Sequence, residues 1–111
     1  LRRAQLETEK VLLFEHTRLD YNALTLTDLE RDEVYQIPRK EFYLLYKLLS
    51  NPEKIFTRLD LLDDIWGMEE DLDERLVDAC IKRVRQKFKE NKDFEIVTIR
   101  GLGYKGTIKN G

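Results

Sequence analysis

The residues with the clearest chemical potential lie between Asp73 and Glu90, in the stretch DERLVDACIKRVRQKFKE. Four apolar residues recur at helical spacing and predict one buried stripe: Val77, Ile81, Val84 and Phe88. At about 100° per residue, the opposite side carries mainly cationic and short side chains: Arg75, Ala79, Lys82, Arg83 and Gln86, flanked by Arg85 and Lys87. Such a helix could be fixed to a core by one face and offer ammonium and guanidinium groups to an anionic partner. A solvated surface is the alternative interpretation.

Length and composition limit what the rest of the chain can be. The chain has 111 residues, of which 41% are hydrophobic and 38% charged, so we expect one globular domain. No apolar run approaches the roughly 20 residues of a membrane helix, and no signal peptide is visible. The single cysteine, Cys80, excludes an internal disulfide framework and fits a reducing compartment, so we expect a cytoplasmic protein.

Charge is unevenly distributed along the chain. The formal net charge is −2, which argues against a uniformly basic nucleic-acid binder. Residues 58–74 nevertheless hold one base and eight acids, for a net charge of −7, whereas residues 75–92 hold seven bases and two acids, for a net charge of +5. Two adjacent segments of opposite sign predict a dipolar molecule with a local basic patch.

The elements that must position this helix can be outlined from the sequence. Residues 11–37 alternate and contain four short candidate strands, which predict an antiparallel meander. Residues 39–50 carry an amphipathic helical stripe of Phe42, Leu45, Tyr46 and Leu49. A short strand at residues 55–56 is then expected.

Next, Thr57 and Asp60 have the spacing of a capping box that starts a second helix. We expect this helix to turn Leu61, Leu62, Ile65 and Trp66 inward and to end at Gly67.

The third helix and the elements after it complete the pattern. Asp71 or Asp73 is expected to cap the third helix. Residues 95–99 and 104–108 are expected to form a hairpin, because two glycines in the turn Arg100–Gly103 permit positive φ. Three helices closed by a hairpin, with a basic last helix, are typical of a winged helix. The predicted fold class is therefore α+β: a four-stranded antiparallel sheet, three helices and a C-terminal β-hairpin wing over residues 11–111. Residues 1–10 are expected to be a linker remnant.

Specific residues also resemble a known family, the OmpR/PhoB-type effector domains of response regulators. The resemblance covers about Val11 to Lys109 and rests on four groups of residues in order. They are Lys40-Glu41-Phe42 with Leu44-Leu45; Thr57-Arg58, Leu61-Leu62 and Ile65-Trp66-Gly67; Arg75, Val77-Asp78, Ile81, Arg83-Val84-Arg85 and Lys87; and Thr98, Arg100-Gly101 and Gly103-Tyr104.

This resemblance implies partners beyond the chain itself. It implies a preceding receiver domain, phosphorylation by a sensor kinase, and dimerisation of an otherwise monomeric domain on tandem half-sites of double-stranded DNA. The loop of Met68, Glu69, Glu70 and Asp71 corresponds to a surface that faces RNA polymerase in the family. Acids that cap the next helix and keep the loop soluble are the alternative interpretation.

Within a major groove, the third helix would present its outward side chains to base edges. Arg83 is expected nearest the middle of the outward face, which makes it the leading base-contacting candidate. Arginine can pair with guanine O6 and N7 through two parallel hydrogen bonds. Asp78 could accept from cytosine N4, and Ala79 could touch a thymine methyl. Phosphate contacts are expected from Arg75, Lys82, Arg85 and Lys87, and the resemblance adds Thr57, Arg58 and Trp66. Arg100, at the hairpin tip, is expected to reach a minor groove, with an exposed turn arginine as the alternative.

Two residues depart from the family pattern and affect the expected contacts. Cys80 stands where the family often has histidine, and we expect it at the side of the outward face, where a thiol cannot grip a phosphate. Leu76 replaces a frequent threonine and is expected to weaken a backbone contact.

Other classes of function are less well supported. No Cys/His cluster has metal spacing and no Gly-rich loop precedes a helix, so no enzyme, metal or cofactor is expected. The remaining alternative is a winged helix used for protein contact, which the acidic balance favours.

Overall fold

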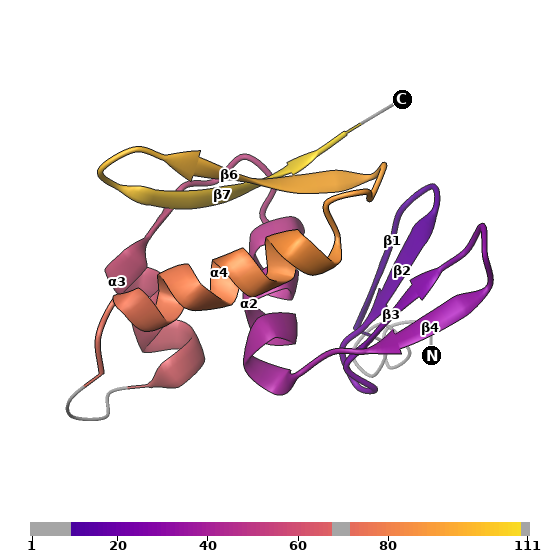
Figure 1. Ribbon diagram of the computed structural model, residues 1–111, viewed down its shortest axis with the longest axis horizontal. Coiled ribbons are helices and arrows are strands. Elements are labelled where there is room, and N and C mark those ends of the chain that lie inside the picture. Colours follow the sequence, from indigo (N-terminus) through magenta and orange to yellow (C-terminus); the bar gives the residue numbers. More distant parts are fainter. Residues whose placement is uncertain (1–9, 68–71, 110–111) are drawn as a thin grey trace, which may run out of the picture.

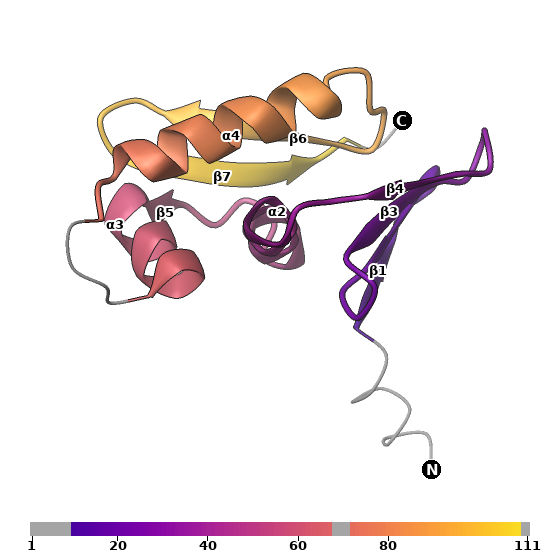
Figure 2. The same ribbon diagram turned by 60° about the horizontal axis from the view of Figure 1, so that its bottom comes forward.

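The computed structural model describes residues 10–67 and 72–109 and has the predicted α+β architecture. Figures 1 and 2 show a sheet at one end and three helical segments beneath a hairpin. The elements in chain order are β1 (Val11–Leu13), β2 (Thr17–Asp20), β3 (Thr25–Asp28), β4 (Glu33–Gln36), α2 (Arg39–Ser50), β5 (Phe56–Thr57), α3 (Arg58–Leu61), the π-helical turn η1 (Leu62–Trp66), α4 (Arg75–Lys87), β6 (Phe94–Ile99) and β7 (Gly103–Ile108). The predicted polymerase-facing residues 68–71 and most of the predicted linker lie outside the described residues.

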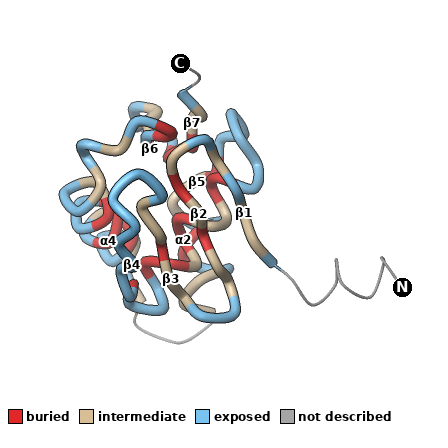
Figure 3. The backbone as a smooth tube through the Cα atoms, turned by 90° about the vertical axis from the view of Figure 1, so that its right-hand side faces the viewer, coloured by how far each residue is buried: buried red, intermediate tan, exposed pale blue. Residues whose placement is uncertain are grey.

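The N-terminal sheet is the predicted antiparallel meander, in the order β1-β2-β3-β4. Its second and third turns are closed by carboxylates, because Asp20 and Asp28 each accept backbone N–H groups from residues two and three positions on. Leu19 faces Leu26 across β2 and β3, and both are buried. The sheet therefore has one apolar side that can pack against the helices, and Figure 3 shows buried residues along β2 and β3.

Helix α2 lies at the centre of the core and has the predicted bounds of residues 39–50. Its buried residues are Glu41, Phe42, Leu44, Leu45, Leu48 and Leu49. Tyr21, just after β2, packs against α2 through Tyr43 and Tyr46, with ring centroids 5.3 and 4.9 Å away. These aromatic contacts join the N-terminal sheet to the helical core.

The second helical segment starts and ends at the predicted residues. Asp60 N–H donates to Thr57 Oγ1 at 3.0 Å and Thr57 N–H donates to Asp60 Oδ2 at 3.1 Å, so the capping box is complete. Gly67 ends the segment with φ of 86°. The segment is not one regular helix, because four α-helical residues widen into the π-helical turn η1.

Helix α4 is the predicted basic helix, shortened to residues 75–87. Val77, Ile81 and Val84 are buried as expected, and Phe88 packs against the core from just beyond the helix. The N-cap position of α4 is Glu74, which makes no side-chain cap hydrogen bond, so the predicted cap at Asp73 is displaced by one residue. Asp73 Oδ1 still accepts the backbone N–H of Arg75 at 2.8 Å, and the other candidate, Asp71, lies outside the described residues.

The wing is the antiparallel pair β6 and β7, with β5 on the other side of β7. Gly101 has φ of 74° in the turn, the conformation for which glycine is suited. Figure 1 shows the hairpin lying along α4, with its turn at the end occupied by α3. The wing and α4 thus border one another over most of the helix.

Candidate nucleic-acid interface

The exposed side of α4 is framed by two flanks that face other elements. Arg83 and Lys87 bond to Glu41 of α2 on one flank, and Asp78 and Arg85 bond to α3 and the wing on the other. Between these flanks, at about 100° per residue, project residues that are all exposed: Arg75, Ala79, Lys82 and Gln86. The middle of the outward face is therefore closest to Ala79 and Gln86, and Arg83 lies at its edge rather than at its centre.

The flank toward α2 is organised by one buried carboxylate. Glu41 is 5% exposed, and its two oxygens accept from different cations of α4. Arg83 Nε donates to Oε2 at 3.0 Å and Lys87 Nζ donates to Oε1 at 2.6 Å. Because burial limits screening by salt, these ion pairs hold both side chains more firmly than exposed pairs would.

The flank toward α3 is organised by a second carboxylate, Asp78. Arg58 donates to it through Nε at 3.1 Å and Nη2 at 2.5 Å, and Tyr104 Oη donates to Oδ1 at 2.6 Å. Burial and the hydrogen bond to Asp78 raise the pKa of Tyr104 to about 12, so the phenol stays protonated and donates. Asp78 and Arg58, expected to contact a base and a phosphate separately, are thus bound to each other.

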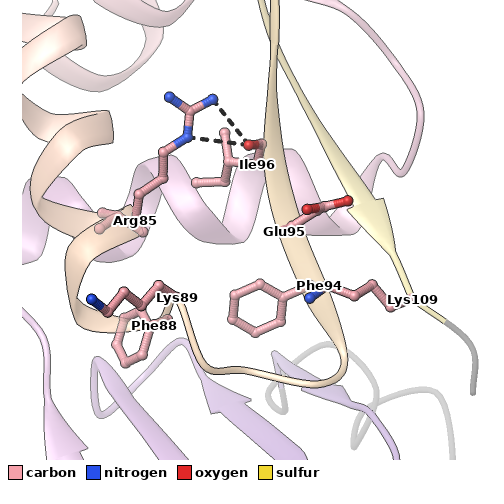
Figure 4. A pocket seen from close by; sticks show the side chains of 8 residues that line it. Arg85, Phe88, Lys89, Phe94, Glu95, Ile96 and Lys109 are labelled. Carbon is pink, nitrogen blue, oxygen red and sulfur yellow. Dashed lines mark hydrogen bonds between the residues drawn. The ribbon is translucent and has the colours of Figure 1, made fainter.

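Arg85 points toward the wing, as Figure 4 shows. Its Nε and Nη2 donate to the carbonyl of Ile96 at 3.1 and 3.0 Å, and Nη2 also reaches Thr98 Oγ1 at 2.5 Å. The guanidinium lies 5.6 Å from the Tyr104 ring centroid. Arg85 therefore ties α4 to β6 and offers fewer free donors to a phosphate than its position in the sequence suggests.

The other predicted site residues lie around this face. Arg75 is 83% exposed and pairs with Asp73 at 2.9 Å, and Lys82 and Arg100 are exposed. Thr57 caps α3, and Trp66 is half-buried with Lys40 Nζ 5.7 Å from its ring centroid. Arg100 lies in the turn of the wing, beyond the end of β6, which agrees with the position expected for it.

Cys80 is not at the side of the outward face, as the sequence led us to expect. Its exposure is 0%, and it packs in the core with Val77, Ile81 and Val84. Burial is the main cause that raises the pKa of this thiol to about 11, so it stays neutral and behaves as a small apolar residue. The position that a relative could use for a phosphate contact is here part of the core.

Glu41 and Tyr104 are two residues of this interface that the sequence did not mark as site residues. Glu41 had a detectable signal, because it lies four and seven residues before Leu45 and Leu48, on the side of α2 that is buried. Tyr104 had none, since its partner Asp78 is 26 residues away. Only the fold brings those two side chains together.

A second polar cluster joins the N-terminal sheet to the loop after α4. Asp93 is 3% exposed and accepts from Thr17 Oγ1 at 2.6 Å and from the backbone N–H of His16 at 2.9 Å. Its other oxygen lies 3.1 Å from His16 Nδ1. Possible metal-ligating atoms of Glu15, His16 and Asp93 lie within 4.8 Å of one another, but hydrogen bonds already account for the buried carboxylate.

Three comparisons with known proteins agree with this geometry. A family model described as "Transcriptional regulatory protein, C terminal" matches residues 32–106. The chain is 39% identical over 106 residues to the heme response regulator HssR of Staphylococcus epidermidis, covering 95% of this chain and 46% of that protein. HssR of Staphylococcus aureus is 38% identical over the same length, so the chain spans about half the length of these curated relatives.

Solved structures share the fold. The DNA-binding domain of Bacillus subtilis CssR is 28% identical with a TM-score of 0.73, covering 82% of this chain and 99% of that one. DrrB of Thermotoga maritima, an OmpR/PhoB homologue, is 31% identical with a TM-score of 0.74, covering 96% and 48%. The Klebsiella pneumoniae RstA DNA-binding domain, in complex with the RstA box, is 27% identical with a TM-score of 0.72, covering 88% and 97%. Among the described residues, no helix is long and apolar enough to cross a bilayer.

Proposed function

The chain belongs to the OmpR/PhoB-type family of winged-helix DNA-binding domains of response regulators, and from this premise we propose how it binds DNA. It is a transcriptional regulatory domain and not an enzyme. In the proposed complex, α4 lies in a major groove with the face of Ala79, Lys82 and Gln86 toward the bases. The wing turn at Arg100 lies over the adjacent minor groove.

One observation carries this proposal: α4 is fixed on both flanks and exposes a strip that is basic between them. Arg83 and Lys87 are held by α2, and Arg85 is held by the wing, so the helix cannot rotate to bury its outward face. Since a major groove about 12 Å wide admits one α-helix, a fixed helix of 13 residues is a suitable probe of base edges.

Arg83 is the proposed base-contacting residue despite its place at the edge of the face. Its side chain is 56% exposed, and only its Nε is bound to Glu41. The terminal nitrogens can then pair with guanine O6 and N7. Ala79 is exposed and short enough to contact a thymine methyl, whereas Asp78 would first have to leave Arg58 and Tyr104 to accept from cytosine.

Phosphate contacts are proposed around the base-contacting residues Arg83 and Ala79. Lys82 and Arg75 are exposed on the outward face, and the capped N-terminus of α3 at Thr57 presents backbone N–H groups. Arg58, Trp66, Arg85 and Lys87 complete the proposed set. Of these, Arg58, Arg85 and Lys87 reach DNA only with donors that are not already bound within the domain.

The organisation of the whole regulator is proposed from the curated relatives, which are about twice as long as this chain. A receiver domain phosphorylated by a sensor kinase would precede this chain, and its dimerisation would bring two copies of the domain to tandem half-sites in the cytoplasm. The loop of residues 68–71 is proposed to face RNA polymerase.

Selection of bound sequences from random duplex DNA, followed by salt titration of the selected site, tests the proposal. We expect an enriched half-site and an affinity that falls steeply with salt, with a log–log slope near −0.9 per phosphate neutralised. A winged helix that serves only protein contact would enrich no sequence and would show little duplex binding even at low salt. That result would refute DNA recognition.

A further inference from the structure

Glu41 is a buried acid whose partners are all on the helix proposed to enter DNA. It belongs to α2, at the centre of the core, and is 5% exposed. In the part of the chain that the structure describes, its hydrogen-bond partners are Arg83 Nε at 3.0 Å and Lys87 Nζ at 2.6 Å, one on each carboxylate oxygen. A carboxylate in the core is costly unless it is paired, so this arrangement is specific.

The hydrogen bond from Arg83 to Glu41 uses Nε and neither of the two terminal nitrogens. A guanidinium is a rigid plane with five N–H donors, and Nε is the donor nearest the backbone. The bond from Nε to Glu41 fixes the direction of the plane without using either terminal nitrogen, and the side chain as a whole is 56% exposed. Those two nitrogens carry the N–H groups that a bidentate contact with guanine requires.

Lys87 maintains this arrangement by occupying the second carboxylate oxygen. If both oxygens were available, Arg83 could bind them in the parallel, bidentate manner that arginine and carboxylate favour. That geometry would use a terminal nitrogen and turn the guanidinium inward, toward α2. With Lys87 on Oε1, the bond that the structure shows between Arg83 and Glu41 is the one from Nε to Oε2.

We propose that Glu41 is a positioning residue for base recognition, which fixes Arg83 in the orientation that contacts DNA, with Lys87 as its second ligand. The inference rests on the proposed function, because it concerns how the base-contacting arginine is oriented. A preorganised side chain loses less conformational entropy on binding, and the gain applies only to the base pair that Arg83 contacts. Glu41 thus acts on specificity without touching DNA.

The test compares Glu41→Gln with Glu95→Gln, which removes the same charge from an exposed residue of β6. Each variant is titrated with the selected half-site, with the same site altered at the base pair that Arg83→Ala identifies, and with unrelated duplex. We expect Glu41→Gln to lower the ratio of affinities for the selected and altered sites about tenfold. Its affinity for unrelated duplex should stay equal or rise, since one negative charge is lost.

In an Arg83→Ala background, Glu41→Gln should leave the ratio unchanged, because the residue that it positions is absent. A purely structural role for Glu41 would instead lower binding to all three duplexes in parallel. That result, or an unchanged ratio in Glu41→Gln, would overturn the inference. A wild-type protein that fails to bind duplex would refute the proposed function itself.

Lys87→Gln provides a second test. It keeps the ion pair of Glu41 and Arg83, and it changes a more exposed residue than Glu41, so it should disturb folding less. Release of one carboxylate oxygen should let Arg83 turn inward, so the ratio should again fall about tenfold. If Lys87 contributes only a phosphate contact, its loss will weaken all duplexes alike and leave the ratio unchanged. That outcome would also contradict the inference, even if Glu41→Gln proved unable to fold.

Discussion

The cations of α4 are chemically similar, but they differ in what holds them. Arg85 is bound to a backbone carbonyl and to Thr98, so its main role is to join α4 to the wing. Arg83 is bound through Nε to Glu41, and its side chain is 56% exposed. Lys82 is exposed on the outward face. The partner of each side chain, more than its charge, determines which of them can report on DNA sequence.

Arg83→Ala and Lys82→Ala should therefore affect DNA binding in different ways. Loss of Arg83 should cost about 1–3 kcal/mol at one base pair and relax selectivity there, because a bidentate contact discriminates between bases. Loss of Lys82 should weaken all sequences alike and reduce the slope of log affinity against log salt by about 0.9. Titration of the selected site and its single-base variants at several salt concentrations measures both effects.

Arg18→Gln is the control for a lost positive charge, since Arg18 lies on β2 of the N-terminal sheet. It should change neither the salt slope nor the base preference. If Arg83→Ala weakened every sequence equally while Lys82→Ala changed the preferred base, Lys82 would be the base-contacting residue.

The hydrogen-bonded pair of His16 and Asp93 predicts that the stability of the domain depends on pH. The hydrogen bond to Asp93 and nearby acids raise the pKa of His16 above its ordinary value of 6.5. Stability from this group is complete below that value and is lost as pH rises through the raised pKa. Burial opposes ionisation of Asp93, but hydrogen bonds from Thr17 and His16 prevail and lower its pKa below 3.8, so its contribution is lost only as pH falls through the lowered value.

Thermal unfolding between pH 4.5 and pH 8.5, in wild type and His16→Gln, measures this contribution. Wild type should exceed the variant in Tm most between about pH 4.5 and 6.5, and the difference should shrink as pH rises further. Glu15→Gln, which removes only an exposed acid 4.0 Å from the ring, should keep most of the difference. A difference that stays constant across this range would show that His16 does not bind its proton more tightly in the folded protein.

At the scale of elements, local patterns were sufficient to predict most of the fold. The bounds of α2, the capping box at Thr57 and the end of the second helix at Gly67 all follow from short-range rules and are confirmed. The widened turn η1 and the burial of Cys80 were not predicted. Free cysteine is among the residue types most often buried, and Cys80 lies three residues after Val77 and four before Val84, so helical spacing already favoured the buried side.

Contacts between residues distant in sequence limit prediction of the candidate site. The basic face of α4 is visible in the sequence, because it depends on spacing within one helix. The pairs of Asp78 with Arg58 and of Arg83 with Glu41 join residues 20 and 42 positions apart. Only the packing of α2, α3 and α4 decides which charged side chains neutralise one another and which stay available.

The antiparallel pairing of β5 with β7 predicts a strict requirement for glycine at position 103. A Cβ on Gly103 would lie 2.0 Å from the carbonyl oxygen of Phe56 and 2.8 Å from the Cα of Thr57, so backbone would have to move. We expect Gly103→Ala to destabilise the domain by about 1–3 kcal/mol, as overpacking does. Chemical denaturation of this variant, with Gly101→Ala as a control for the wing turn, measures the cost.

The two glycines should fail for different physical reasons. Gly101 has φ of 74° with open space around it, so alanine there strains only the turn and leaves the pairing with β5 intact. Gly103→Ala should also weaken DNA binding, because β5 precedes the capped start of α3 at Thr57. Equal stability of Gly103→Ala and wild type would show that β5 is not held against β7 in solution.

At the scale of the whole molecule, opposite charges are segregated along consecutive segments. The −7 of residues 58–74 and the +5 of residues 75–92 give a dipolar domain whose net charge is only −2. Attraction to DNA is therefore local to the face of α4 and its surroundings, within a Debye length of about 8 Å at physiological salt. The electrostatic field of such a domain orients it toward DNA, but a single copy of the domain binds DNA only weakly.

A single domain with this charge balance should bind one half-site weakly, and two joined copies should bind far more tightly. If two copies are joined by a flexible linker, binding of the second becomes intramolecular, and affinity for a tandem site should rise by about 10² or more. The gain requires half-sites on the same side of the duplex, about 10 bp apart. Lengthening the spacing to about 15 bp should remove most of it with a short linker, because the second site then faces the opposite side. The unjoined chain should bind both spacings equally, and a spacing preference of the unjoined chain would reveal direct contact between neighbouring domains.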